Sequence, residues 1–309
     1  MGGSGGGSYT DWTGDSLARE VREDNEKKAA DFELQLAGYL SELLANYNSR
    51  DVDLVRSRIL ESTEALEDTL DSSLDQIFGG SVAKHTYVDG LSDIDSLLII
   101  DGSKFEDLKP ATILSRMDAI LTEKFGESVK VEHGRLAVTV TYPDGMSIQL
   151  LPAIRSENGI RIPDPQSSGW SDINPDGFRQ ALTKRNDECG GKLIPIIKLA
   201  KAVIASMPEQ YRLSGYHVES LAIAAFRGFD GPKISATMLP YFFERAKSLV
   251  LFPIRDRTGQ SVHVDEYLGE ENGSLRQYVG RLLGNIAKRM TNASAAQSPA
   301  QWRAIFAED

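Results

Sequence analysis

The sequence predicts an α+β fold, with a mixed sheet in the first half of the chain and a helical second half. Short apolar segments bordered by turn residues recur between residues 94 and 151, which is typical of strands. Beyond residue 154 apolar residues instead recur every three or four positions, which is typical of helices. With 309 residues, 41% of them hydrophobic, the chain is long enough to bury a substantial core, and we expect it to fold as two lobes.

Two helices are expected before the first strand. The first covers residues 15–47 and places apolar side chains from Phe32 to Leu43 on one face. The second begins near Asp51 and carries an almost heptad apolar stripe as far as Ile77, where two glycines end it. Such a stripe is typical of a coiled coil or of a helix packed along a sheet, and its end at a glycine turn favours the second interpretation.

A crossover helix and three strands complete the first half. Pro110 lies near the start of the helix, which is expected over residues 109–125. The strands are expected over residues 129–132, 136–142 and 146–151. The second half is expected to form helices over residues 175–189, 192–207, 216–229, 237–249, 274–292 and 299–306.

The segment of residues 79–100 is the most informative part of the sequence. Gly80 and the glycine before it remove side chains at a turn, and Ser81 adds a hydroxyl beside the exposed amides. This combination suits a phosphate group. We expect Thr86 to add a polar contact to the same ligand. Two further residues of this loop are interpreted as solvated: Lys84 and His85.

Two aspartates follow at alternating positions, directly before an apolar run. Asp93 and Asp95 share one face of the expected strand, while Ile94 between them points into the core. Parallel carboxylates are costly unless a cation neutralises them. Their hard oxygen atoms suit Mg²⁺ or Mn²⁺ that also binds substrate phosphates. The segment therefore predicts a site for a nucleoside triphosphate and a divalent metal ion.

Together these motifs resemble the Gly-Ser and Asp-x-Asp signature of the DNA polymerase β nucleotidyltransferase superfamily. The resemblance implies a polymerase β-like sheet and a third carboxylate on a neighbouring strand, but the matching strand reads SIQLLPAI and has Gln149 in that place. A glutamine offers one neutral amide oxygen and cannot act as a base. Three interpretations stay open: an active enzyme with a weaker second metal site, recruitment of another acid such as Glu132, or a nucleotide-binding pseudoenzyme.

Two features of the second half bear on the same site. Lys198 and Lys201 lie one turn apart on an expected helix and can address one ligand. Tyr216, in GYHVESLAI, can stack on a base. Their order resembles the second lobe of cyclic GMP-AMP synthase and oligoadenylate synthase, which implies two lobes around a cleft, lysines that reach the triphosphate and a tyrosine that stacks on the nucleobase. His217 and Glu219 are interpreted as structural.

Over most of its length the sequence resembles bacterial CD-NTases, the nucleotidyltransferases of CBASS anti-phage systems that are similar to cyclic GMP-AMP synthase and dinucleotide cyclase. The resemblance implies a Mg²⁺-dependent enzyme that joins nucleoside triphosphates such as ATP and GTP into a cyclic di- or trinucleotide second messenger and releases pyrophosphate. It also implies an operon-encoded activator or effector. Two alternatives stay open: a terminal nucleotidyltransferase acting on RNA or a toxin partner, and a catalytically weak nucleotide sensor, which Gln149 motivates.

Composition limits the partners and the compartment. The formal net charge of -11 disfavours an extended nucleic-acid-binding surface. No apolar stretch approaches the ~20 residues of a membrane helix, and no export signal is recognisable, so we expect no membrane partner and a cytoplasmic location. The single cysteine, Cys189, predicts neither a disulfide nor a zinc site. We expect a flexible linker over residues 1–10, a nucleotidyltransferase core with long N-terminal helices over residues 11–158, and a helical lobe over residues 159–309.

Overall fold

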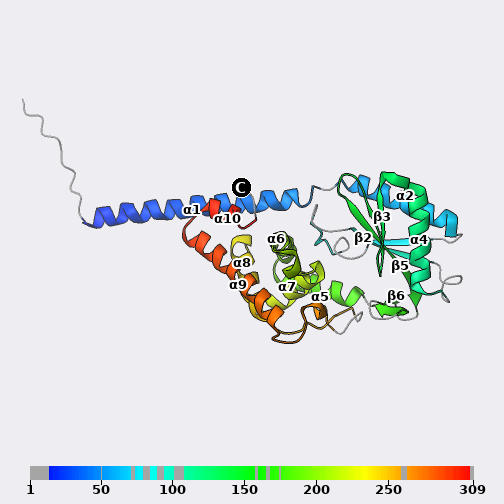
Figure 1. Cartoon of the computed structure of the whole chain (residues 1–309). Helices are drawn as coiled ribbons and strands as arrows, with labels where there is room; N and C mark the ends of the chain where they lie inside the picture. The colour runs from blue at the N-terminus through cyan, green and yellow to red at the C-terminus, as the bar shows by residue number, and fades with distance from the viewer. Residues whose placement is uncertain are drawn as a thin grey trace, which may run out of the picture.

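The chain has the predicted α+β architecture, with a mixed sheet in one lobe and a bundle of helices in the other (Figure 1). The computed structural model describes residues 14–49, 51–70, 74–78, 84–88, 94–100, 108–156, 159–164, 168–173, 175–258 and 263–306.

The first helix, α1 (Gly14–Asn46), packs on the helical lobe although it precedes the sheet in the sequence. Its buried residues between Phe32 and Leu43 share one core with the helices of the second half, so the predicted apolar face is confirmed. Residues 18–28 are exposed, and this part of the helix extends beyond the rest of the described chain (Figure 1). Tertiary packing therefore uses the C-terminal half of the helix.

The predicted second helix was too long. It ends as α2 (Val52–Leu70), and a strand, β1 (Leu74–Phe78), follows where the prediction continued the helix. The backbone N–H of Leu74 donates to the carboxylate of Glu67 at 2.7 Å, and β1 pairs antiparallel with the next strand. The three- and four-residue spacing of its apolar residues also fits a helix, but the neighbouring strand supplies hydrogen-bond partners for its backbone, and this pairing decides the structure.

One sheet contains all seven strands of the described chain, in the order β1-β2-β5-β4-β3, and β6 pairs with both β5 and β7. β2 and β5 are parallel, and every other pair is antiparallel. The strands after β1 are β2 (Ile94–Ile100), β3 (Lys130–His133), β4 (Val138–Thr141), β5 (Ser147–Ser156), β6 (Gly159–Pro163) and β7 (Trp170–Ile173).

The strands expected near residues 129–151 are confirmed as β3, β4 and β5, whereas β6 and β7 were not predicted. Their short sequences contain glycine and proline and resemble a loop, and pairing with β5 makes them strands. The sheet thus continues beyond residue 158, the expected border of the first lobe. We propose a border between β7 and the helix that follows it.

Two helices cover one face of the sheet. α2 and α4 (Pro110–Phe125), which has the expected proline at its first turn, pack against alternate residues of β2 and β5. Ile94 is among them and is fully buried, as predicted. The intervening positions of β2, Leu97 and Ile99, pack on the opposite face with residues of β5, β6 and β7. The alternation required of a strand buried on both faces is therefore present.

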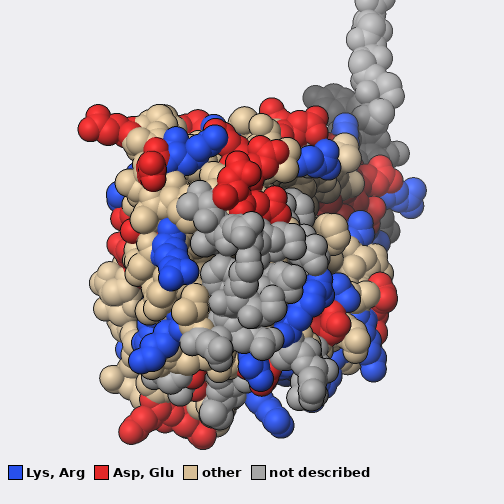
Figure 2. All heavy atoms as spheres, turned by 90° about the vertical axis from the view of Figure 1, so that its right-hand side faces the viewer, with Lys and Arg blue, Asp and Glu red and all other residues tan. Residues whose placement is uncertain are grey.

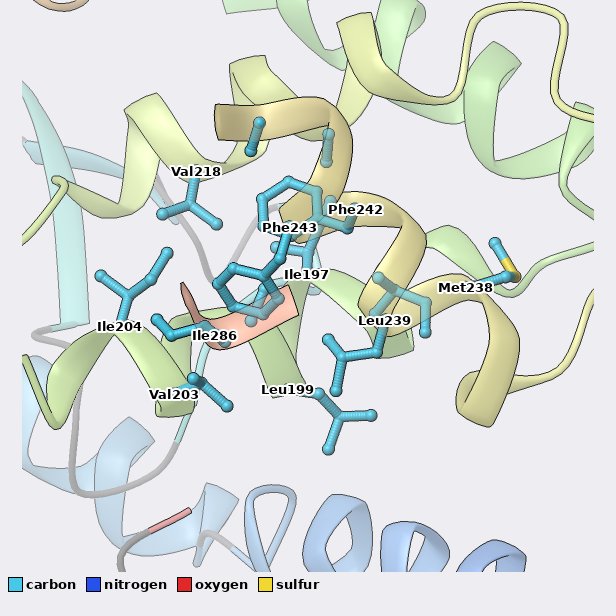
Figure 3. Packing of buried hydrophobic residues seen from close by; sticks show 14 of the residues in the cluster. Ile197, Leu199, Val203, Ile204, Val218, Met238, Leu239, Phe242, Phe243 and Ile286 are labelled. Carbon is cyan, nitrogen blue, oxygen red and sulfur yellow. The ribbon is translucent and has the colours of Figure 1, made fainter. Parts of the chain in front are cut away.

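The helical lobe confirms the helices predicted in the second half. Phe242 and Phe243 of α8 (Ser235–Leu249) pack with aliphatic side chains from neighbouring helices (Figure 3). The helices are α5 (Pro175–Glu188), α6 (Leu193–Ala205), α7 (Gly215–Ala225), α8 (Ser235–Leu249), α9 (Ser274–Ala295) and α10 (Pro299–Arg303). Short 3-10 turns are η2 (Gly126–Ser128), η3 (Glu209–Tyr211) and η4 (Glu266–Leu268). Within the described ranges, no helix combines the length and apolar character needed to cross a membrane.

Candidate active site

A row of polar positions crosses four neighbouring strands. Asp95 of β2 is the register partner of Gln149 of β5, Gln149 pairs with Thr139 of β4, and Thr139 pairs with Glu132 of β3. The strand that carries Gln149 is thus the direct neighbour of the strand that carries Asp95. Because the neighbouring residues Ile94 and Ile148 are fully buried under α2 and α4, this row belongs to the other face of the sheet.

Glu132 is too distant to replace a third carboxylate beside Asp95. Three strand spacings separate the two positions, or roughly 14 Å at the usual interstrand distance. Glu132 is also exposed and pairs with Lys130 at 2.8 Å. Gln149 is one spacing away, so among the members of this row it is Gln149 that can share a ligand with Asp95.

Several predicted residues lie outside the described part of the chain: Gly80, Ser81 and Asp93. The side chain of Asp95 is also outside it, although its backbone lies in β2. Among the described residues, no group of three or more His, Cys, Asp or Glu side chains forms a metal site. The carboxylate and amide oxygens at Asp95 and Gln149 are nevertheless of the hard type that Mg²⁺ accepts, so the donor types at these paired positions fit the expected ion.

The loop between β1 and β2 contacts the helical lobe through Thr86 and Lys84. Thr86 is fully buried, and its hydroxyl donates to the carboxylate of Glu219 on α7. Lys84 was interpreted as solvated, which is wrong: its side chain is 14% exposed and forms an ion pair with Glu219. The reason is that a buried carboxylate on the other lobe lies within its reach, which local sequence does not reveal. His85 is exposed, as predicted.

The two lysines predicted to share one ligand have different partners. The side chain of Lys201 is 7% exposed, and its ammonium group donates to Glu219 at 2.8 Å and to the carbonyl oxygen of Thr86 at 3.0 Å. Lys198 lies one turn earlier on α6 and donates to the side chain of Asn48, just after α1. The structure therefore brings Lys201 and Thr86 together and directs Lys198 toward the end of α1.

Tyr216 lies beside the same cluster. Its ring centroid is 4.7 Å from that of Phe178 on α5, and its hydroxyl donates to Asp256 at 2.6 Å. The ammonium group of Lys84 lies 4.7 Å from the Phe178 ring centroid and 5.1 Å from that of Tyr216. Burial and the neighbouring Asp256 carboxylate raise the pKa of the Tyr216 hydroxyl, which stays protonated. Phe178 and Asp256 were not predicted, because no motif distinguishes them in the sequence.

Glu219 and His217 are buried on α7, in agreement with the structural role expected of them. Burial by itself would raise the pKa of Glu219, but the charges of Lys84 and Lys201 outweigh it and hold the pKa below its usual value. Burial lowers the pKa of His217 to about 4, so the imidazole is neutral near pH 7. Its Nδ1 atom lies 2.8 Å from the hydroxyl of Tyr267.

Comparisons with known proteins identify a family that matches part of the chain. The family described as "Second Messenger Oligonucleotide or Dinucleotide Synthetase domain" matches residues 34–186, which extend from α1 through the sheet into α5. No curated protein sequence matches the chain.

Solved structures of CD-NTases share the fold. The CD-NTase CdnG of Bradyrhizobium diazoefficiens, in complex with GTP, has a TM-score of 0.64 and 18% identity, covering 89% of this chain and 95% of that chain. CdnC of E. coli MS115-1, in complex with HORMA-deltaN, has a TM-score of 0.61 and 18% identity, covering 82% and 90%. The DncV cyclic AMP-GMP synthase of Vibrio cholerae has a TM-score of 0.62 and 9% identity, covering 95% and 91%. The chain therefore has a CD-NTase fold, and through residues 34–186 it belongs to the Second Messenger Oligonucleotide or Dinucleotide Synthetase family of nucleotidyltransferases.

Proposed function

We propose that this protein joins nucleoside triphosphates into a cyclic di- or trinucleotide second messenger. The observation that carries the proposal is the pairing of Asp95 with Gln149 on adjacent parallel strands, inside the region that matches the synthetase family. A ribose hydroxyl of one nucleotide attacks the α-phosphorus of another, a new P–O bond forms, and the bond to the β-phosphate breaks as pyrophosphate leaves. A second transfer closes a dinucleotide ring, and a third is needed to close a trinucleotide ring.

We assign the metal-binding role to Asp93 and Asp95, with Gln149 beside them. Mg²⁺ or Mn²⁺, when bound, would neutralise the phosphate charge that builds up during transfer. The two carboxylates would orient the donor triphosphate, and Gln149 would offer its amide oxygen on the acceptor side. Since an amide cannot accept the hydroxyl proton, that proton passes to solvent or to a substrate phosphate. Catalysis would then depend mainly on positioning.

The nucleotide-binding role is assigned to residues from both lobes. Gly80 and Ser81 would hold phosphate through the turn before β2, with Thr86 following in the same loop. Lys198 and Lys201 would supply positive charge from α6, and Tyr216 would stack on a base. The contacts of Thr86 and Lys201 with Glu219 support a single site shared by the two lobes.

The substrates proposed are ribonucleoside triphosphates, with ATP and GTP first. CdnG was solved with GTP and CdnC with ATP. On the described part of the face shown in Figure 2, basic and acidic side chains are interspersed, which suits small substrates better than a long nucleic acid. CdnC was also solved with a HORMA partner, and we propose an operon-encoded activator or effector for this chain, with an anti-phage role in the cytoplasm.

The test is incubation with the four ribonucleoside triphosphates and Mg²⁺ or Mn²⁺. We expect mass spectrometry to show phosphatase-resistant cyclic products. Asp95→Asn should lower the rate of product formation at least ~100-fold, because the variant lacks the carboxylate that would hold the metal ion against the negative charge of the transition state. Glu132→Gln is the matched control and should keep wild-type activity, since Glu132 lies three strands away. Equal losses in both variants, or folded wild-type protein that converts no nucleotide even with its operon partners, contradict the proposal.

Gln149 favours one second candidate, a nucleotide sensor with weak or no turnover. A neutral amide in place of a carboxylate weakens the binding of a second ion, while nucleotide binding by the other residues is unaffected. We predict that Gln149→Asp raises the rate of product formation about tenfold or more at limiting Mg²⁺. Gln149→Leu serves as the control and should lower the rate. Tight nucleotide binding without product in wild type, and product in Gln149→Asp, would establish the sensor instead.

A further inference from the structure

A buried carboxylate connects the loop before β2 to the helical lobe. Glu219 is 1% exposed and accepts hydrogen bonds from Lys84, Thr86 and Lys201. Lys84 and Thr86 belong to the loop between β1 and β2, whereas Lys201 and Glu219 belong to α6 and α7. We call these four side chains the Glu219 cluster. It joins segments that are more than a hundred residues apart in the sequence.

The cluster restrains backbone as well as side chains. Lys201 donates both to Glu219 and to the carbonyl oxygen of Thr86, so one ammonium group connects the backbone of the loop to the carboxylate on α7. Removing a buried carboxylate that has two ammonium partners is strongly destabilising, because the two cations would remain buried without a counterion. The loop position at Thr86 is therefore determined by α6 and α7 and not by the sheet alone.

The cluster also adjoins the ring predicted to stack on a base. The ammonium group of Lys84 lies over the rings of Phe178 and Tyr216, at 4.7 and 5.1 Å from their centroids. Tyr216 is in turn fixed by its hydrogen bond to Asp256. A change at Glu219 thus reaches both the loop that follows the predicted phosphate turn and the predicted base platform.

We propose that Glu219 is a positioning residue that holds residues 84–88 against α6 and α7, at the separation between the lobes that nucleotide binding requires. This inference rests on the proposed function, because it assumes that the turn preceding residue 84 binds the triphosphate. In this arrangement Lys201 also holds the backbone of Thr86, since its ammonium group donates there and to Glu219. Glu219 itself does not touch the substrate.

The first test is Glu219→Gln, which keeps the shape of the side chain and removes its charge. We expect faster amide hydrogen exchange in residues 84–88 and about tenfold weaker binding of ATP with Mg²⁺ by calorimetry, as for one lost charged hydrogen bond. Glu244→Gln is the matched control: it removes a carboxylate from an exposed pair with Lys247 on α8 and should change neither quantity. If Glu219→Gln does not fold, Thr86→Val removes one donor to the same carboxylate and tests the same restraint.

A double variant separates positioning from simple stability. Adding Lys84→Met to Glu219→Gln removes one cation left without its counterion, so the melting temperature should recover while ATP affinity stays low. Recovery of affinity together with stability would overturn the positioning role. Unchanged exchange in residues 84–88 of Glu219→Gln would overturn it as well, whether or not the protein converts nucleotides. A third outcome is faster exchange in residues 84–88 of Glu219→Gln together with no nucleotide binding by the wild-type protein. That outcome would contradict the proposed function and the positioning role, but it would leave the contact between the lobes established.

Discussion

Buried ionisable side chains on α7 show how one residue's surroundings determine its chemistry. Glu219 is charged because two lysines surround it, whereas His217, two positions earlier, is neutral because burial outweighs the nearby Asp265 carboxylate. Asp265 already pairs with the buried Arg276 at 2.6 Å. The same helix therefore carries a carboxylate that needs its charge and an imidazole that must remain neutral.

The neutral state of His217 predicts a pH dependence of stability. Its pKa is about 4 in the folded chain against an ordinary value of 6.5, so between these values the unfolded chain binds more protons. The free energy of unfolding should therefore rise with pH across this window. The contribution of His217, about 3 kcal/mol, should be fully present above pH 6.5 and should disappear as the pH falls to 4. Urea unfolding at a series of pH values measures it.

The control for this prediction is an exposed histidine. His217→Gln should flatten the slope between pH 4 and 6.5, whereas His133→Gln, at an exposed position of β3, should leave it intact. If the free energy of unfolding of His217→Gln still rises between pH 4 and 6.5, groups other than His217 cause the pH dependence. The lowered pKa of Glu219 acts in the same direction but below its ordinary value of 4.5, so the upper part of the window reports on His217.

Among the elements, the close contact of α8 with α9 depends on a glycine. A Cβ atom at Gly280 would lie 2.7 Å from the backbone carbonyl oxygen of Lys247, which cannot move without displacing α8. These two helices form much of the helical core, with Phe242 and Phe243 on α8 (Figure 3). A small residue at position 280 is therefore a condition for packing this pair.

We predict that Gly280→Ala lowers the free energy of unfolding by about 1–3 kcal/mol, because the added methyl group overpacks the contact. Gly38→Ala is the matched control within α1: a Cβ there meets nothing within 4 Å, so the change should stabilise by up to about 1 kcal/mol through helix propensity. Denaturant unfolding of both variants gives the comparison. Shifts of the same sign would show that the contact at Gly280 is not tight in solution.

Across the described part of the molecule, the two largest of three hydrophobic cores are connected by a polar junction. One core lies between the sheet and its two covering helices, and the other joins α1 to the helices of the second half. The contacts that Lys84 and Thr86 make with Glu219, and that Lys201 makes with the backbone of Thr86, are hydrogen bonds and an ion pair. Such a junction can rearrange at lower cost than an apolar core, which suits a nucleotide site between lobes.

Binding across this junction should stabilise the chain. We predict that ATP with Mg²⁺ raises the melting temperature by several degrees, since a ligand at one hundred times its Kd adds about 2.7 kcal/mol. The Asp93→Asn, Asp95→Asn double variant should lose the part of the shift that requires Mg²⁺. Thermal unfolding with and without a chelator measures both effects. An equal shift in wild type and double variant would place the bound ion elsewhere.

Strong local signals explain which elements the sequence predicted. Helices such as α4 and α9 combine regular apolar spacing with proline or polar residues at their starts, and those signals act within a few residues. β1, β6 and β7 lack such signals, and each is a strand because another strand pairs with it. The missed strands are thus the elements whose structure depends most on distant neighbours.

The sequence by itself determined the class of fold and the alternation that buries Ile94, because these follow from local periodicity. The resemblance to a known superfamily implied the placement of Gln149 on the strand beside that of Asp95. Only the tertiary structure decided that Glu132 is out of reach, that Lys84 is paired, and that Lys201 holds the backbone of Thr86. The physical reason is that the partners of a buried charge come from segments far apart in the chain, and their distance is determined by packing rather than by sequence separation.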